Sequence, residues 1–316
     1  MKVIVTGGAG FIGRALCTHL LETGHDVVLI DNFQETLYPS ASRRKFVQVA
    51  KSTPGLVFLE RDLRDPRSMN DLEVPDVIIH EAAVPGLLPS WAAFDDYLTC
   101  NVTTLRTVLE FARRDTRTHV VLASTSSVYG SSGVGDESLP LNPVSPYGMT
   151  KLSAEYLLSA YRATFGVSGT VLRYFSVFGP RQRPDMAYAR FLEMLLGGAR
   201  LPVTGDGTQT RSMTYIDDIV RATILACERR LDGEIFNISG SEEASVLDVI
   251  DILADEIGCK PKIEFTSWRA GDQVRTMGDS SRAKALLGWS PRTSVEEGLR
   301  IQARQAMADQ PKSQPK

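Results

Sequence analysis

The fold is decided near the start of the chain by the stretch Val3-Ile4-Val5-Thr6-Gly7-Gly8-Ala9-Gly10-Phe11-Ile12-Gly13. Its short apolar run predicts a buried strand, and the helical pattern that follows ends at Gly24. Glycines at Gly7, Gly10 and Gly13 permit a tight turn and a close approach of the backbone to a ligand. The stretch therefore predicts a pyrophosphate at the helix N-terminus.

A glycine cluster alone is weak evidence, and this spacing differs from the more familiar Gly-x-Gly-x-x-Gly. The next segment supports the interpretation, because residues 26–30 form a second apolar run that ends at Asp31. A carboxylate at that strand end can accept both ribose hydroxyls of a dinucleotide and repel a 2′-phosphate. The pattern favours NAD over NADP.

Further apolar runs alternate with helical patterns along the first half of the chain. Strands are predicted at 56–59, 76–80, 119–123 and 168–173, the last of which should close the sheet, and one long helix is predicted over 91–114. This alternation predicts an α/β fold, a Rossmann-like doubly wound parallel sheet with a smaller mixed α/β C-terminal substrate domain.

With 316 residues the chain is too long for one small core. We expect a dinucleotide-binding domain at 1–174, to which 214–238 return, and a substrate domain at 175–213 and 239–310. A disordered tail is expected at 311–316, where the residues are polar and proline-rich.

The segment from Ser145 to Lys151 predicts the start of another helix. Ser145 suits the N-cap and Pro146 the first turn. Tyr147 and Lys151 then stand four residues apart on one helix face. A fixed ammonium and the positive end of the helix dipole should lower the pKa of Tyr147, which makes this tyrosine a candidate acid/base.

Composition excludes several classes of partner. Apolar residues make up 43% of the chain, charged residues 23%, and the formal net charge is -3, which indicates neither a nucleic-acid nor a membrane partner. The cysteines follow no ligand spacing and the histidines form no cluster, so no metal is expected. Since no signal peptide or membrane-spanning run is visible, the cytoplasm is the expected compartment.

Taken together, the motifs resemble the extended short-chain dehydrogenase/reductase family, in particular its NAD-dependent nucleotide-sugar epimerases and dehydratases. The resemblance extends to about Leu299. It rests on residues 6–13, Thr125, the Tyr147-x-x-x-Lys151 pair and three later segments: Arg173-Tyr174-Phe175-Ser176-Val177-Phe178-Gly179-Pro180, Gly205-Asp206-Gly207-Thr208-Gln209-Thr210-Arg211 and Arg269-Ala270-Gly271-Asp272.

The resemblance implies roles residue by residue. Tyr147 would be the acid/base, Lys151 would hold the nicotinamide ribose, and Thr125 would bind the reacting sugar oxygen. The implied NAD contacts are Gly7, Gly10, Phe11, Ile12, Gly13, Asp31, Asn32, Asp62, Leu63, Ala82, Ala83, Asn101, Tyr147, Lys151 and Tyr174. The implied contacts to a UDP-sugar are Pro85, Gly86, Thr125, Ser126, Ser127, Ser176, Arg183, Met186, Val203, Arg211, Arg269 and Asp272.

Relatives share the first step, in which the sugar 4-OH is oxidised to a 4-keto group. The dehydratases carry Asp-Glu directly after the catalytic Thr, whereas this chain has Ser126-Ser127. Hydroxyls cannot replace these carboxylates in eliminating water, so dehydration is disfavoured. Related decarboxylases typically carry Glu at position 127, which argues less firmly against decarboxylation. Epimerisation at C4 remains.

Residues 181–187 indicate the substrate, because this segment resembles the one found in UDP-glucuronate 4-epimerases. Ser176 supports a uronate, because neutral-sugar epimerases often carry Asn there. Together with Thr125, Ser126 and Ser127 it could hold a C5 carboxylate. UDP-glucose and UDP-N-acetylglucosamine 4-epimerases are the alternatives, followed by a UDP-glucuronate decarboxylase. An NAD-binding regulatory protein is the non-enzymatic alternative, although such relatives usually lose the Tyr or the Lys.

Two further expectations come from the family. The resemblance suggests a homodimer through the helices that contain Leu105 and Tyr156, although their apolar spacing is equally compatible with core packing. Glu81 stands where the family usually has a neutral residue, and the sequence leaves open whether it disturbs the cofactor crevice or points away.

Overall fold

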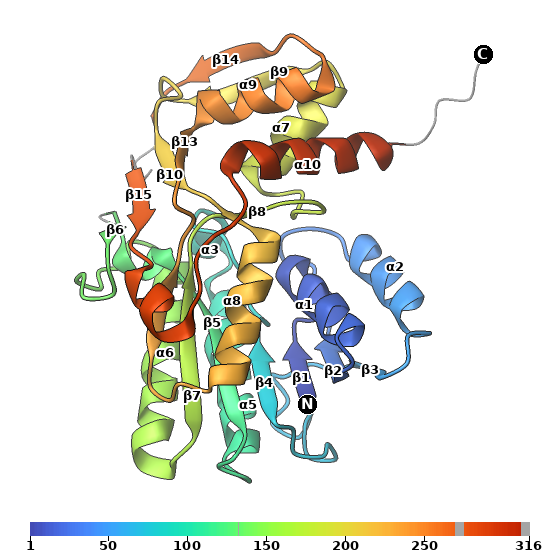
Figure 1. Ribbon diagram of the computed structural model, residues 1–316, viewed down its shortest axis with the longest axis vertical. Helices are drawn as coiled ribbons and strands as arrows, with labels where there is room; N and C mark the ends of the chain where they lie inside the picture. Colours follow the sequence, from blue (N-terminus) through green and yellow to red (C-terminus); the bar gives the residue numbers. More distant parts are fainter. Residues whose placement is uncertain (132, 269–274, 311–316) are drawn as a thin grey trace.

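The computed structural model describes residues 1–131, 133–268 and 275–310 (Figure 1). The predicted tail at 311–316 lies outside this range. The elements are β1 (Lys2–Thr6), α1 (Phe11–Glu22), β2 (Asp26–Asp31), α2 (Ala41–Ala50), β3 (Leu56–Glu60), β4 (Val77–His80), α3 (Pro89–Ala92), α4 (Phe94–Leu98), the π-helix η1 (Thr99–Thr103), α5 (Thr104–Ala112), β5 (His119–Thr125), the 3-10 helix η2 (Ser126–Tyr129), β6 (Val134–Gly135), α6 (Pro146–Phe165), β7 (Ser168–Tyr174), β8 (Val177–Phe178), α7 (Ala187–Leu196), β9 (Arg200–Thr204), β10 (Thr210–Ser212), β11 (Thr214–Tyr215), α8 (Ile216–Arg229), β12 (Ile235–Ile238), β13 (Glu243–Ser245), α9 (Val246–Ile257), β14 (Lys262–Thr266), β15 (Arg275–Gly278), the π-helix η3 (Ala283–Leu287) and α10 (Val295–Ala308).

A seven-stranded parallel sheet forms the centre of the molecule. Its strand order is β12-β7-β5-β4-β1-β2-β3, and every neighbouring pair is parallel. The order reverses at β1, which places the carboxyl ends of β1 and β4 at the switch point where such sheets bind ligands. The α/β prediction is confirmed. Strand β7, predicted to close the sheet, is followed at the edge by β12.

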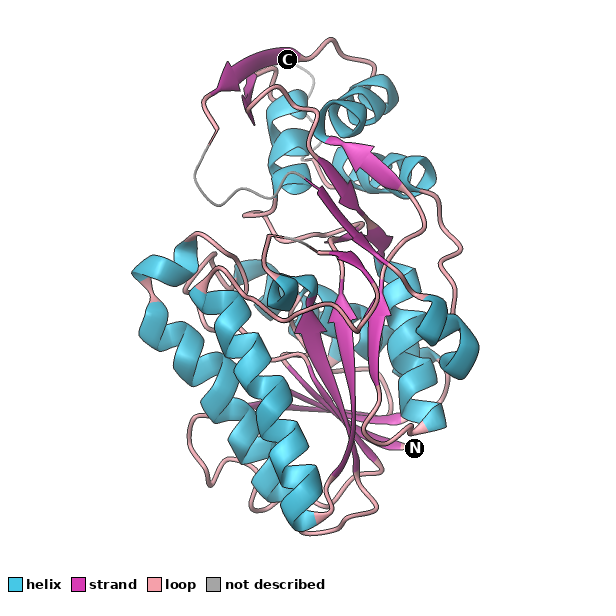
Figure 2. Cartoon of the chain, turned by 90° about the vertical axis from the view of Figure 1, so that its left-hand side faces the viewer, coloured by secondary structure: helices cyan, strands magenta, loops and turns pink. Residues whose placement is uncertain are grey.

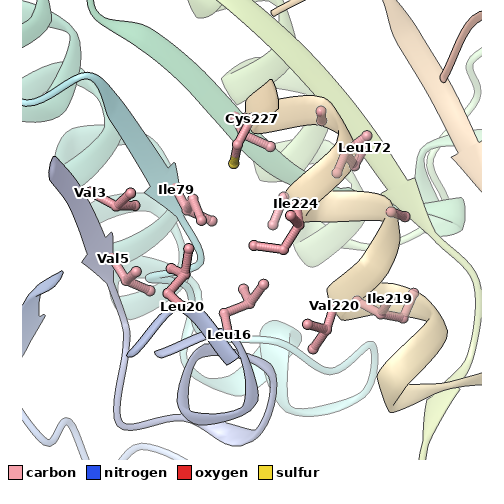
Figure 3. Close-up of a cluster of buried hydrophobic side chains, with 14 of the residues drawn as sticks. Val3, Val5, Leu16, Leu20, Ile79, Leu172, Ile219, Val220, Ile224 and Cys227 are labelled. Carbon is pink, nitrogen blue, oxygen red and sulfur yellow. The ribbon is translucent and has the colours of Figure 1, made fainter. Parts of the chain in front are cut away.

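Helices cover both faces of the sheet (Figure 2). The strands carry apolar side chains on both faces of the sheet. A parallel sheet of this kind buries both faces under helices. Figure 3 shows one core, in which Val3 and Val5 of β1 meet Leu16 of α1 and Ile224 of α8. A second core on the opposite face packs β4 and β5 against α5 and α6.

The long helix predicted over 91–114 is wrong as a single element. The structure divides this segment into α3, α4, η1 and α5. Ala93, which has φ −122° and ψ 39°, departs from helical geometry and separates α3 from α4. Periodic apolar residues continue through the π-turn of η1, so a pattern of periodicity alone cannot reveal these interruptions.

Helices α7, α9 and α10 and the strands beside them, called here the C-terminal elements, lie above the carboxyl ends of the central strands (Figure 1). Helices α7, α9 and α10 share a separate core with β9 and β11. Beside them lie a four-stranded sheet of order β13-β10-β15-β6 and the two-stranded pairs β14-β9 and β11-β8. These helices and small sheets cover one side of the switch point of the central sheet. No helix within the described ranges has the length and apolarity needed to cross a membrane.

Leu105, which lies on one of the two helices expected at a dimer interface, is fully buried within the chain. It packs on β4 and β5 as part of the second core. Tyr156 on α6 is 61% exposed and remains available to a partner. The apolar spacing around Leu105 therefore marks the inward face of α5, which is the core packing that the sequence left open, and the homodimer stays a prediction.

Candidate active site

A cavity of about 510 Å³ lies at the carboxyl ends of the central strands, under the C-terminal elements. That volume lies within the range of small-molecule sites. It brings together nearly all of the predicted site residues within the described ranges. They are Gly7, Gly10, Phe11, Ile12, Gly13, Asp31, Asn32, Asp62, Leu63, Ala82, Ala83, Pro85, Gly86, Thr125, Ser126, Ser127, Tyr147, Lys151, Tyr174, Ser176, Arg183, Met186 and Arg211.

The glycine turn between β1 and α1 forms one end of this cavity. Gly7 has φ +67°, and a Cβ there would lie 2.7 Å from the backbone nitrogen of Ala82. A Cβ on Gly13 would lie 2.3 Å from the carbonyl oxygen of Gly7. Side chains at these positions would therefore destroy the turn. The turn therefore presents only backbone atoms at the N-terminus of α1, an arrangement that fits the pyrophosphate of a dinucleotide.

Asp31 closes the cavity beyond the glycine turn. Its carboxylate accepts hydrogen bonds from the N–H groups of Ala9 (3.1 Å) and Phe33 (2.7 Å), and Arg43 Nη1 lies 3.6 Å away. Burial raises the pKa of Asp31, while these donors and Arg43 oppose the rise. The carboxylate is thus fixed at the strand end, where the ribose of a dinucleotide would bind.

We expect Asp31→Asn to weaken NAD binding roughly tenfold or more, because a charged hydrogen-bond acceptor is lost. The variant should also narrow the preference for NAD over NADP. Arg43 would lose its counter-ion and become available to a 2′-phosphate. Titrating both cofactors into the wild type, Asp31→Asn and the control Asp26→Asn, at the exposed far end of β2, would check this. An unchanged NAD to NADP affinity ratio would contradict the assignment.

Tyr147 and Lys151 enter the cavity from the first turns of α6. The Ser145 hydroxyl accepts the N–H of Gly148 at 3.1 Å and caps the helix as predicted, with Pro146 in the first turn. The Tyr147 ring packs edge-on against Tyr97, with centroids 6.2 Å apart. Tyr97 is itself held by a 2.7 Å bond from its hydroxyl to the Pro85 carbonyl. The acid/base candidate is therefore rigidly placed.

The predicted lowering of the Tyr147 pKa by Lys151 is wrong for this structure. Burial is the largest influence and raises the pKa of Tyr147. A hydrogen bond with Thr125 and the charge of Arg183 act in the opposite direction. The phenol is therefore the resting form, and a further positive charge beside it would be needed to favour the phenolate.

Lys151 lies in the same buried chamber. Burial lowers its pKa to about 8, while the carboxylates of Glu81 and Glu155 oppose this shift. Glu155 lies one turn further along α6 and forms a buried ion pair with Arg173, with Nη2 2.7 Å from Oε2. The charges of Glu81 and Glu155 thus both act on Lys151, and of these two residues only Glu81 also lines the cavity.

A group of hydroxyls lines the cavity together with Tyr147. Thr125 ends β5, and its Oγ1 accepts the N–H of Ser127 at 3.1 Å and lies 3.1 Å from the Ser127 hydroxyl. Within the described ranges, the side chains of Ser126 and Ser176 make no hydrogen bond, although both line the cavity. Their hydroxyls are available to a ligand.

Two arginines, Arg183 and Arg211, bring positive charge to the cavity. Arg183 Nη2 lies 2.9 Å from Asp185 Oδ2 and 3.3 Å from the sulfur of Met186, and its charge lowers the pKa of Tyr147. Arg211 on β10 donates from Nη1 to the carbonyl of Thr210 at 2.8 Å. Guanidinium groups suit a diphosphate or a carboxylate ligand.

Two predicted contacts do not line the cavity. Asn101 in η1 is buried, accepts the N–H of Val84 at 2.8 Å and donates to its carbonyl at 3.1 Å. It therefore positions the cavity wall that follows β4. Val203 is buried in the C-terminal core. Arg269 and Asp272, expected at the diphosphate and the ribose, lie outside the described residues.

Sequence reasoning missed residues that the fold brings into the cavity. Arg43 and Tyr38 line it beside Asp31, with the Arg43 guanidinium carbon 5.1 Å from the Tyr38 ring centroid. No motif marks either residue. Glu81 also lines the cavity, which answers the question left open above. No group of three or more potential metal ligands occurs in the part of the chain that the structure describes.

The fold and the cavity define a Rossmann-type enzyme that binds a dinucleotide beside a tyrosine–lysine pair. Comparison with known proteins agrees. Residues 3–239 match the model of the NAD dependent epimerase/dehydratase family, and the chain belongs to that family.

Three similar proteins illustrate the relationship. A Bacillus subtilis protein named as an uncharacterized UDP-glucose epimerase, YtcB, is 41% identical over 95% of this chain and 96% of its own. The UDP-glucuronate 4-epimerase of Thermodesulfobacterium geofontis is 37% identical over 94% and 93%. The crystal structure of the Bacillus cereus UDP-glucuronic acid 4-epimerase with UDP-glucuronic acid and NAD superposes with a TM-score of 0.91 at 38% identity, covering 98% of this chain and 99% of that chain.

Proposed function

We propose that this enzyme is an NAD-dependent UDP-glucuronate 4-epimerase, which interconverts UDP-glucuronate and UDP-galacturonate. The observation that carries the proposal is the set of four hydroxyls, from Thr125, Ser126, Ser127 and Ser176, that line the same cavity as Tyr147. Such a set binds a carboxylate without supplying an acid or a base for further chemistry. The names of the Thermodesulfobacterium geofontis and Bacillus cereus relatives support the same substrate.

NAD, held at the glycine turn and Asp31, would supply the hydride acceptor for C4 of the sugar and the hydride donor for its opposite face. The chain supplies the proton transfers. Tyr147 takes the proton of the 4-OH as the hydride leaves and gives it back when the hydride returns. Burial raises the pKa of Tyr147, so a cationic nicotinamide ring bound beside it would be needed to favour the phenolate. Thr125, hydrogen-bonded to Tyr147, holds the reacting oxygen.

The hydroxyls also explain why the carboxylate would be retained. A 4-keto uronate is a β-keto acid, which loses CO₂ when its carboxylate bond stands perpendicular to the carbonyl plane. Ser126 and Ser176 have hydroxyls available to hold that carboxylate near the plane. Arg183 lines the same cavity and can add charge while Asp185 holds its guanidinium. Ser126-Ser127 leaves out the acid/base pair that dehydration needs.

We expect Ser176→Ala and Arg183→Ala to divert part of each turnover to the decarboxylated 4-keto pentose, because each removes one restraint on the carboxylate. The ratio of decarboxylated to epimerised product should rise severalfold above the wild type. It can be measured by separating the products of UDP-glucuronate by chromatography and mass. Met149→Ala, an exposed change on α6, is the control. A uniform loss of turnover with an unchanged ratio would remove both residues from carboxylate control.

A UDP-glucose or UDP-N-acetylglucosamine 4-epimerase is the second candidate. The name of the Bacillus subtilis relative favours a neutral hexose. A decarboxylase ranks third, because no carboxylate stands at position 127. An NAD-binding regulatory role ranks last, since Tyr147 and Lys151 are both present and face one cavity.

We further propose that residues 1–174 and 214–238 hold the cofactor, while 175–213 and 239–310 hold the sugar nucleotide. The pairing of β12 with β7 supports the return of the second segment. A homodimer in the cytoplasm is part of the same proposal. The exposed ring of Tyr156 on α6 supports an interface on that helix, and light scattering of Tyr156→Glu beside the wild type would test it.

A further inference from the structure

Glu81 is a charged residue in the cofactor cavity that the reaction described above does not use. It directly follows β4, where the glycine turn comes so close that a Cβ on Gly7 would lie 2.9 Å from the Glu81 carbonyl carbon. Its residue lines the cavity with Tyr147 and Lys151. The carboxylate therefore belongs to the same end of the site as the acid/base.

A hydrogen-bonded row holds Glu81 in place. The Tyr174 hydroxyl lies 2.9 Å from Glu81 Oε1 and 2.8 Å from the hydroxyl of Thr223. Thr223 in turn donates to the carbonyl of Ile219 at 2.9 Å. This row fixes the side chain between the sheet and α8. A neutral glutamine could accept the same bond from Tyr174, so the hydrogen bond alone does not explain a negative charge.

The charge of Glu81 acts on three other titratable groups, Lys151, Tyr147 and Tyr174. Burial raises the pKa of Glu81 to about 7, while Lys151 and the bond from Tyr174 oppose the rise. Glu81 in turn raises the pKa of both Lys151 and Tyr147. His80, next to it on β4, has its pKa lowered by burial to about 3 and stays neutral. Lys151 is thus the cation that faces Glu81 within the described structure.

A carboxylate that raises the pKa of Tyr147 does not help that residue to act as a base. A buried carboxylate is also costly unless cations face it, and Lys151, the cation here, is shared with Glu155. A ligand group that carries positive charge beside Tyr147 and Lys151 would remove this cost. Of the groups that the proposed reaction brings there, the oxidised nicotinamide ring is cationic. It becomes neutral when it takes the hydride, two electrons and one proton, from the sugar, while the hydroxyl proton passes to Tyr147.

We propose that Glu81 is the counter-ion of the oxidised nicotinamide and sets the balance between the oxidised and the reduced cofactor in this site. The inference rests on the proposed use of NAD but not on the identity of the sugar. A carboxylate favours the cationic ring over the neutral one, so it drives the hydride back to the keto sugar. Glu81 thereby shortens the time for which the keto intermediate exists.

The test compares the affinities of NAD and NADH without any sugar, by calorimetry and by NADH fluorescence at pH 8. In Glu81→Gln the ratio of NAD to NADH affinity should fall roughly tenfold, which is about 1.4 kcal/mol. Glu81→Asp keeps the charge and should retain most of the wild-type ratio.

Glu22→Gln, on the exposed end of α1, is the matched control for the loss of one charge. Glu81→Leu provides a second neutral variant in case the glutamine variant folds poorly. An unchanged ratio in a folded neutral variant would overturn the proposal. Equal losses of affinity for both cofactors would make Glu81 a packing residue and would overturn it as well. Neither result depends on which sugar the enzyme converts.

Discussion

Tyr147→Phe should lower kcat by roughly 10²–10⁴-fold, the range that a positioned acid/base contributes. The hydroxyl is the one group in the proposed mechanism that removes and returns the proton of the sugar 4-OH. The phenylalanine ring should keep the edge-on contact with Tyr97, so the cavity wall is preserved. NAD binding should therefore stay within about twofold of the wild type.

The matched control is Tyr156→Phe, which removes the same atom from an exposed position on the same helix. It should retain full turnover. Steady-state kinetics and calorimetric NAD titrations of the two variants separate chemistry from cofactor binding. Retained activity in Tyr147→Phe would rule out this tyrosine as the acid/base. A parallel loss of NAD binding would mean that its hydroxyl holds the cofactor instead.

Glu155→Ala should lower the free energy of unfolding by about 3–5 kcal/mol, the cost of leaving a buried charge without its partner. The side chains of Glu155 and Arg173 are only 4% and 2% exposed. Arg173 Nη2 donates to Glu155 at 2.7 Å, and Nη1 donates to the Tyr129 hydroxyl at 2.8 Å. The Ser124 hydroxyl also donates to Glu155. Without the carboxylate, Arg173 would keep its charge in an apolar setting.

Urea unfolding of the cofactor-free protein would measure this loss. The double variant Glu155→Met with Arg173→Met removes both charges and should be more stable than Glu155→Ala, because no unpaired charge remains. Glu73→Ala removes the partner of Lys2 in an exposed ion pair and should leave the unfolding midpoint nearly unchanged. A Glu155→Ala midpoint equal to that of Glu73→Ala would contradict the importance of the buried pair.

The strands and the catalytic helix could be predicted from sequence because their signals are local. Strand β2 ends at Asp31 as its apolar run indicates, and Ser145 caps α6 as its side chain allows. Periodicity could not show that the segment before α5 is broken, because apolar residues continue through the break. Periodicity also left open whether Leu105 faces the core or a partner, since a helical stripe does not say which neighbour covers it.

Site residues were predictable where a motif marked them and not where only the fold assembles them. Arg43 reaches Asp31 from α2, and no spacing links the two positions. The pKa of Tyr147 was misjudged for a related reason. Charge neighbours can be read from the spacing on α6, but the degree of burial depends on the whole cavity, and burial is the largest influence on this phenol.

The most direct test of the central claim is product analysis. Purified protein and NAD would be incubated separately with UDP-glucuronate, UDP-glucose and UDP-N-acetylglucosamine, and the products separated by chromatography and mass. The proposed function predicts a product of equal mass, UDP-galacturonate, from the uronate and little conversion of the other two sugars. A product lighter by one CO₂ would identify a decarboxylase, and conversion of the neutral sugars alone would contradict the assigned role of Ser176 and its neighbouring hydroxyls.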